Sequence, residues 1–209
     1  MSFQDIFNGL QQGLHDMTWL EAIAVTFAVL SVLFQKKNNI LVYPTGIIST
    51  GIYTYLLSRE HFKLYADATL NAYYLVMSVY GWLYWAKRGP EQPVVRITLS
   101  NTRELITATL IALLGWAVFY LLLVNFSDSN VPVMDAFVSA TACGGMWLLA
   151  KRKLENWIWL NVSNFVAVPL LFYKHLYLTA FLTIFLFIVA VFGYISWKKT
   201  VHEQEILHT

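Results

Sequence analysis

The stretch ENWIWLNVSN, residues 155–164, holds the side chains best suited to recognising a ligand. Trp157, Asn161 and Asn164 are spaced by four and three residues, so in a helix they share one face, while Trp159 points the opposite way. A carboxamide offers two donors and two lone pairs, which suits another amide or the edge of a heteroaromatic ring. An indole beside it supplies a flat face for an aromatic or cationic ring. The stripe therefore predicts a binding site for a cationic aromatic molecule, with hydrogen bonding between helices as the alternative role.

Two other apolar segments carry polar side chains at helical spacing. Inside hydrocarbon such side chains face a protein interior or a cavity, although Thr45 and Ser49 are better explained as contacts between helices. Asp67 lies near one end of its segment, where it either attracts a cation or marks an entrance. The residues of these stripes that we assign to the substrate site are Asp67, Asn71, Tyr74, Ser78 and Trp82 in one segment and Tyr53 in the other.

Other kinds of chemistry find no support in the sequence. An enzyme would need a nucleophile with a base within reach, and the stripes offer only Ser78 or Cys143 with no neighbouring histidine. The five histidines lack metal-ligand spacing, and no phosphate-binding glycine-rich loop is present. A net charge of +2 is too small to indicate nucleic acid as a partner. We therefore expect no catalytic residue, no metal and no cofactor.

The elements that position these stripes are predicted from composition. Only 12% of the residues are charged, against about 25% in soluble domains, and the apolar residues gather in windows close to the roughly 20 residues that span a bilayer core. Residues 1–18 lack the features of a signal peptide and read as an amphipathic helix lying in the membrane interface. The fold class is thus all-α, an integral membrane protein with seven transmembrane helices near 19–34, 39–58, 65–86, 104–124, 133–150, 156–173 and 177–197.

The distribution of lysine and arginine predicts the orientation. Successive connections between the predicted spans lie on alternate sides of the membrane. The connections on one side hold eleven lysine and arginine residues, and those on the other side hold three. The positive-inside rule places the eleven in the cytoplasm, with the N-terminus outside and the C-terminus inside. The eleven are Lys36, Lys37, Lys87, Arg88, Arg96, Arg103, Lys151, Arg152, Lys153, Lys198 and Lys199; the three are Arg59, Lys63 and Lys174.

An internal repeat predicts the architecture. A Leu-Tyr pair, an aromatic-glycine pair (Tyr80–Gly81 and Phe192–Gly193) and a closing tryptophan (Trp85 and Trp197) recur at an offset of 112 residues. Two parallel three-helix units joined by one extra helix, a 3+1+3 arrangement, would have the site near the midplane between the units. The predicted organisation is an amphipathic segment 1–18, a first repeat 19–88, a linking helix 104–124, a second repeat 133–199 and a cytoplasmic tail 200–209.

The run Glu155-Asn156-Trp157, with Asn164 seven residues beyond the tryptophan and Pro169 and Tyr177 following, resembles the PnuC-type vitamin transporter family. KKNNILVYPTGIIS and KLYADATLNAYYLVMSVYGW are similar to the same family, so the resemblance covers most of residues 19–199. It implies a fold related to the SWEET sugar facilitators and a substrate motif of Trp, two residues, Trp, three residues, then Asn or Asp. The second tryptophan position of this motif holds Leu160, with Trp159 one place early.

The resemblance implies uptake of an unphosphorylated vitamin precursor by facilitated diffusion, followed by trapping through a cytoplasmic kinase. Nicotinamide riboside (vitamin B3) is the expected substrate, thiamine (vitamin B1) is the alternative, and a non-transporting helical membrane protein is the more remote one. The expected location is the bacterial inner membrane, with membrane lipid and a second copy of the chain as the other partners that such a protein could have.

Overall fold

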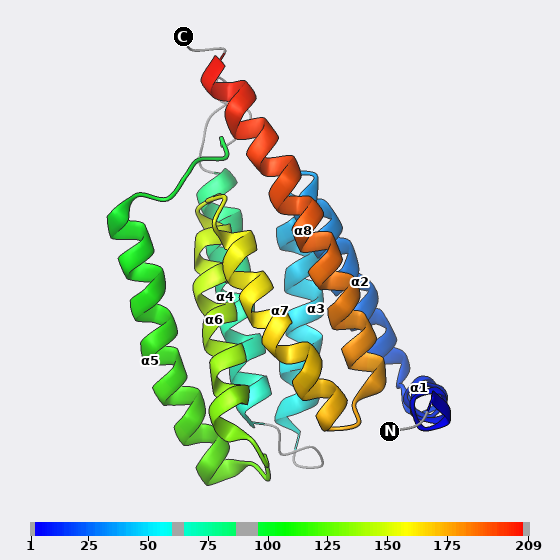
Figure 1. The fold of residues 1–209 in the computed structure, drawn as a ribbon. Helices are drawn as coiled ribbons and strands as arrows, with labels where there is room; N and C mark the ends of the chain where they lie inside the picture. Colours follow the sequence, from blue (N-terminus) through cyan, green and yellow to red (C-terminus); the bar gives the residue numbers. More distant parts are fainter. Residues whose placement is uncertain (1–2, 60–64, 87–95, 207–209) are drawn as a thin grey trace.

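The computed structural model describes residues 3–59, 65–86 and 96–206, and helices dominate these residues (Figure 1). Within these residues an isolated β-bridge joins Thr98 to Lys153. The helices in the described part of the chain are α1 (Phe3–Asp16), α2 (Trp19–Lys36), α3 (Val42–Ser58), α4 (Tyr65–Ala86), α5 (Thr102–Phe126), α6 (Pro132–Ala150), α7 (Asn156–Tyr173) and α8 (Tyr177–Ile206).

The predicted helix windows agree with the observed helices. Six of the seven match α2 to α7 within three residues at either end. The seventh ends too early, because α8 continues past residue 197 to Ile206. Its extension contains no helix breaker and carries a Lys199–Glu203 pair at 3.8 Å, the i,i+4 spacing that supports a helix. The first part of the predicted tail 200–209 is therefore helical, and residues 207–209 lie outside the described residues.

Length and composition identify four of the described helices as able to cross a membrane, namely Trp19–Lys36, Thr102–Phe126, Pro132–Ala150 and Tyr177–Gln204. The remaining predicted spans, α3, α4 and α7, carry the polar stripes, and asparagine and hydroxyl side chains lower mean hydropathy. The count of seven spans thus stays a prediction for these three helices. The predicted basic residues Lys63, Lys87 and Arg88 lie outside the described residues.

The helix α1 lies across the others and is seen almost end-on in Figure 1. It packs on the start of α8, where a Cβ atom at Gly9 would stand 2.2 Å from the Tyr177 ring. Its apolar side chains Phe7 and Leu14 stay exposed, at 58% and 62%. A bilayer surface would cover these two side chains, and the interfacial position of α1 stays a prediction.

The contacts between helices close a ring. The helix α3 packs between α2 and α4, and α7 packs between α6 and α8. Two seams join these groups, one between α4 and α6 and the other between α2 and α8. We call these helices the six-helix ring; α5 lies beside it against α6 and α4 (Figure 1). The group α2–α4 and the group α6–α8 are called the two halves of the ring.

The helix α6 is enclosed on several sides because its surface is made of small residues. A Cβ atom at Gly144 would stand 3.0 Å from the Ala108 carbonyl oxygen of α5. A Cβ atom at Gly145 would stand 2.9 Å from Leu160 Cγ of α7. On the same side Ser163 donates a hydrogen bond to the Val138 carbonyl oxygen over 2.8 Å. The two glycines therefore let both α5 and α7 approach α6 closely.

Candidate functional site

The α7 stripe divides as its helical spacing predicts. Trp157 packs on α8, where a Cβ atom at Gly193 would stand 2.6 Å from its ring. Trp159 packs on α6 instead, where a Cβ atom at Gly144 would stand 3.0 Å from its ring. Asn161 and Asn164 are both half-buried. The two tryptophans thus occupy different faces of α7, as expected from their separation by two residues.

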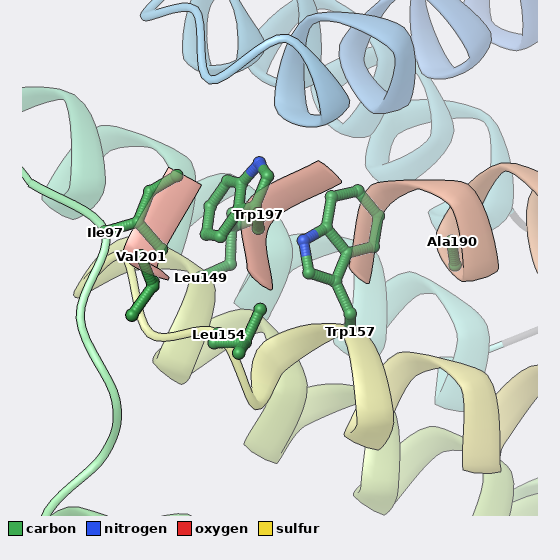
Figure 2. Packing of buried hydrophobic residues seen from close by; sticks show 7 residues of the cluster. All are labelled: Ile97, Leu149, Leu154, Trp157, Ala190, Trp197 and Val201. Atoms are coloured by element: carbon green, nitrogen blue, oxygen red, sulfur yellow. The ribbon is translucent and has the colours of Figure 1, made fainter. Parts of the chain in front are cut away.

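The Trp157 indole is completely covered by protein. Its exposed fraction is 0%, and its ring meets the Trp197 ring edge-on, with centroids 5.6 Å apart and an interplanar angle of 87°. Figure 2 shows the two indoles side by side, with Trp157 on α7 and Trp197 on α8. The open stacking face expected for a ligand is therefore absent in this conformation. The cause is Gly193, which has no side chain to hold α8 away from the ring.

The α4 stripe reaches from the exposed ends of the helix into its buried middle. Ser78 is 1% exposed and Tyr74 is half-buried. Asn71 donates to the Asp67 carbonyl oxygen of its own helix over 2.9 Å. Asp67 is exposed, and Trp82 is 42% exposed. The structure therefore places Tyr74 and Ser78 among the packed helices, whereas the outermost members of the stripe remain accessible.

The polar stripe of α3 meets that of α4 at Gly46. A Cβ atom at Gly46 would stand 3.2 Å from Ser78 Oγ and 3.3 Å from Ser31 Oγ, so polar groups of α2, α3 and α4 converge there. Ser31 donates to the Val42 carbonyl oxygen over 2.8 Å. Tyr53 lies further along α3 and is half-buried. Thr45 donates to the Leu41 and Val42 carbonyl oxygens at the start of its own helix, so these bonds do not form the contact between helices that was expected for it.

Several of these side chains contain buried polar atoms without a hydrogen-bond partner. Among the described residues they include Ser78 Oγ, Trp157 Nε1 and Asn161 Oδ1. Leaving such an atom unpaired costs about 1–3 kcal/mol, and most buried polar atoms in native proteins do have a partner. Three residues that the sequence assigns to a ligand site thus hold unused hydrogen-bonding capacity.

A groove of about 360 Å³ runs between α7 and α8 and reaches Asn161, and the fully covered Trp157 lies beneath its floor. Its walls are apolar and include Phe165, which is 70% exposed, and Ile195, which is 57% exposed. Side chains this exposed lie on the outer surface of the packed helices. The groove therefore opens on the outside of the six-helix ring, and its shape does not indicate a path through the ring.

Charged side chains gather at the two ends of the helices. Lys174 pairs with Asp135, which also accepts a hydrogen bond from Ser129 over 2.5 Å. At the other end Lys153 pairs with Glu104 at 2.9 Å. No group of three or more His, Cys, Asp or Glu side chains that could hold a metal occurs in the part of the chain that the structure describes.

Sequence reasoning missed a polar layer near the end of the ring that carries most of the basic residues. Gln35 of α2 donates from Nε2 to Asn156 Oδ1 of α7 over 2.8 Å, and both side chains are buried. Arg152, which is 2% exposed, donates to the Asn38 carbonyl oxygen over 2.8 Å. The sequence signal for this layer was the recurrence of the closing tryptophans, Trp85 and Trp197. The Arg152 guanidinium lies over the first of them, 3.3 Å from the centroid of the Trp85 ring.

Known proteins resemble this chain along most of its length. A family model described as nicotinamide mononucleotide transporter matches residues 18–199. A nicotinamide riboside transporter PnuC of Neisseria mucosa is 26% identical over 205 residues, which cover 88% of this chain and 73% of that protein. The nicotinamide riboside transporter PnuC of Escherichia coli K12 is 16% identical, over 92% of this chain and 90% of that protein. A crystal structure of the vitamin B3 transporter PnuC has the same fold, with a TM-score of 0.69 and 23% identity, and covers 96% of this chain and 89% of that one.

Proposed function

Because the chain belongs to the nicotinamide mononucleotide transporter family, we propose that this bacterial inner-membrane protein carries nicotinamide riboside across the membrane. The observation that carries the proposal is the set of unpaired buried atoms on Ser78, Trp157 and Asn161. The substrate combines a cationic pyridinium ring with a carboxamide and ribose hydroxyls. Amide, hydroxyl and indole groups are suited to bind all three parts by hydrogen bonding and cation–π contact.

The arrangement of covered cations favours the riboside over its phosphorylated form. Arg152, Lys153 and Lys174 already have partners, respectively the Asn38 carbonyl, Glu104 and Asp135. A phosphate in a protein interior needs charged or backbone donors. A mononucleotide whose phosphate bound at one of these three cations would have to displace its partner, whereas a riboside carries no phosphate. We place the substrate between the stripes of α3, α4 and α7, at Tyr53, Asp67, Asn71, Tyr74, Ser78, Trp82, Trp157, Asn161 and Asn164.

Thiamine is the second candidate because of one departure from the family motif. Leu160 stands where the resemblance expects a tryptophan, and it packs against Gly145. This position therefore supplies no second ring for stacking, and a different cationic vitamin could use the space. Uptake measurements have to include both compounds for this reason.

The proposed architecture is two three-helix units joined by α5, with seven crossings. The contact pattern supports it, because the middle helix of each half touches both of its neighbours and the two seams pair the first helix of one half with the last of the other. A site between the halves then suits alternating access, in which one half rocks against the other.

Transport should be passive. Nicotinamide riboside loaded outside proteoliposomes should equilibrate across the membrane without accumulating, and neither a proton nor a sodium gradient should change the final level. A cytoplasmic kinase would then trap the vitamin in the cell. The measurement is uptake of labelled nicotinamide riboside, nicotinamide mononucleotide and thiamine into vesicles that contain the protein. Gradient-driven accumulation would contradict passive transport, and uptake of none of the three would contradict the proposed function.

The N-terminus should lie outside and the C-terminus in the cytoplasm. The expectation comes from the eleven basic residues on one side of the predicted topology. A reporter that works only in the cytoplasm should therefore be active when fused after Thr209. A reporter that works only in the periplasm should be active when inserted at Ser129. The reverse pattern at either site would show that the orientation or the number of crossings is wrong.

A further inference from the structure

We propose that the basic end of the six-helix ring is closed by two reciprocal tryptophan–carbonyl contacts, and that breaking both of them opens the substrate pathway at this end. The inference rests on the proposed transport function. The contacts join the two halves across both seams. Trp85 of α4 donates from Nε1 to the Ala150 carbonyl oxygen of α6 over 3.3 Å. Trp197 of α8 donates from Nε1 to the Gln35 carbonyl oxygen of α2 over 3.1 Å.

The two contacts are equivalent under the internal repeat. The tryptophans are 112 residues apart, and each acceptor lies in the last turn of the first helix of the opposite half. The last four carbonyl groups of a helix have no partner within the helix. Each half thus adds its closing tryptophan to the end of a helix of the other half, where the Gln35 carbonyl also accepts from the Asn38 backbone N–H over 2.9 Å. A single motion that separates the halves at this end would break both tryptophan contacts.

Each tryptophan is held by an equivalent pair of residues in its own half. The Tyr43 ring meets Trp85 edge-on at 4.7 Å and 88°, as Trp157 meets Trp197. A Cβ atom at Gly81 would stand 2.3 Å from the Tyr43 ring. A Cβ atom at Gly193 would likewise stand 2.6 Å from the Trp157 ring. Tyr43 and Trp157 therefore pack on equivalent glycines, and each holds the closing tryptophan of its own half. Each closing tryptophan is thus expected to move with its own half.

The remaining space in the layer is filled by polar contacts that also cross between the halves. The Gln35–Asn156 amide pair joins α2 to α7, and Arg152 reaches both the Asn38 carbonyl and the Trp85 ring. Gln35, Asn156 and Arg152 are at most 4% exposed, and Trp85 is 6% exposed. A layer this closely filled blocks the passage of a vitamin, yet its contacts across the seams are individual hydrogen bonds that could break and form again.

The test measures access to a cysteine placed behind the layer. The native cysteine is removed by Cys143→Ala, and Ser78→Cys provides the reporter two helical turns beyond Trp85. A membrane-impermeant maleimide is applied to inside-out vesicles and to spheroplasts. Trp85→Phe with Trp197→Phe keeps an aromatic ring at each place but removes both N–H donors. We expect at least fivefold faster labelling in the inside-out vesicles, and a smaller increase for each single variant.

The matched control is Trp116→Phe. Trp116 also donates from Nε1 to a carbonyl, that of Val133 over 3.0 Å, but this contact joins α5 to α6 outside the ring. It should leave labelling unchanged. If the double variant does not elute as a single folded species, Trp85→Phe and Trp197→Phe are each compared with Trp116→Phe instead, because each removes one of the two contacts.

Unchanged labelling in the variants, an increase only in spheroplasts, or an equal increase with Trp116→Phe would overturn the proposal. Labelling requires no substrate. A failure of the closing contacts is therefore distinguishable from a failure of the proposed substrate, which the uptake measurements test separately.

Discussion

Asn164→Leu should weaken binding of nicotinamide riboside by about 5- to 150-fold. Leucine has nearly the same size but cannot hydrogen-bond, so the polar edge of the ligand would be left unpaired at a cost of about 1–3 kcal/mol, and each 1.4 kcal/mol is a factor of ten in affinity. Asn164 is half-buried on α7, so leucine can occupy its place. Calorimetry on detergent-purified protein measures the change.

Asn125→Leu is the matched control for this substitution. Asn125 lies on α5 outside the six-helix ring, and its amide donates to the Leu121 carbonyl oxygen of its own helix over 2.7 Å. It should bind nicotinamide riboside like the unaltered protein. Normal binding by Asn164→Leu, or equal loss in both variants, would contradict the placement of the site. Trp157→Ala is a poorer test, because removing a fully buried indole destabilises a fold by about 3–5 kcal/mol on its own.

Gly145→Val should lower the stability of the folded protein by about 1–3 kcal/mol, the usual cost of overpacking. Even the first added carbon would stand 2.9 Å from Leu160 Cγ and 3.2 Å from the Leu160 backbone nitrogen. A side chain can rotate away, but a backbone atom moves only if α7 shifts as a whole. The expected result is a lower thermal unfolding midpoint in detergent, measured by scanning fluorimetry.

Gly51→Ala provides the comparison, because a Cβ atom there meets nothing within 4 Å. Its midpoint should be equal to or above that of the unaltered protein, since alanine is favoured over glycine inside a helix by about 0.5–1 kcal/mol. A midpoint for Gly145→Val equal to that of Gly51→Ala would show that α6 and α7 are not packed as closely as described.

The sequence alone was sufficient for the features that depend on neighbours along the chain. Helix windows follow from runs of apolar residues, so α4 and α7 were predicted at Tyr65–Ala86 and Asn156–Tyr173. The faces of α7 follow from a rotation of about 100° per residue, so Trp157 and Trp159 were correctly placed on different sides. Residues 18–199 also matched the family that the motifs had indicated.

Only the tertiary structure decided what each face touches. The sequence expected an open indole at Trp157, but Gly193 lets α8 approach and cover it. The contacts of Trp85 with Ala150 and of Trp197 with Gln35 join residues 65 and 162 positions apart. Helical spacing fixes the direction of a side chain relative to its own axis, whereas the distance to a neighbouring helix depends on small residues on both surfaces. For that reason the closed layer at the basic end could be seen only after the helices were packed together.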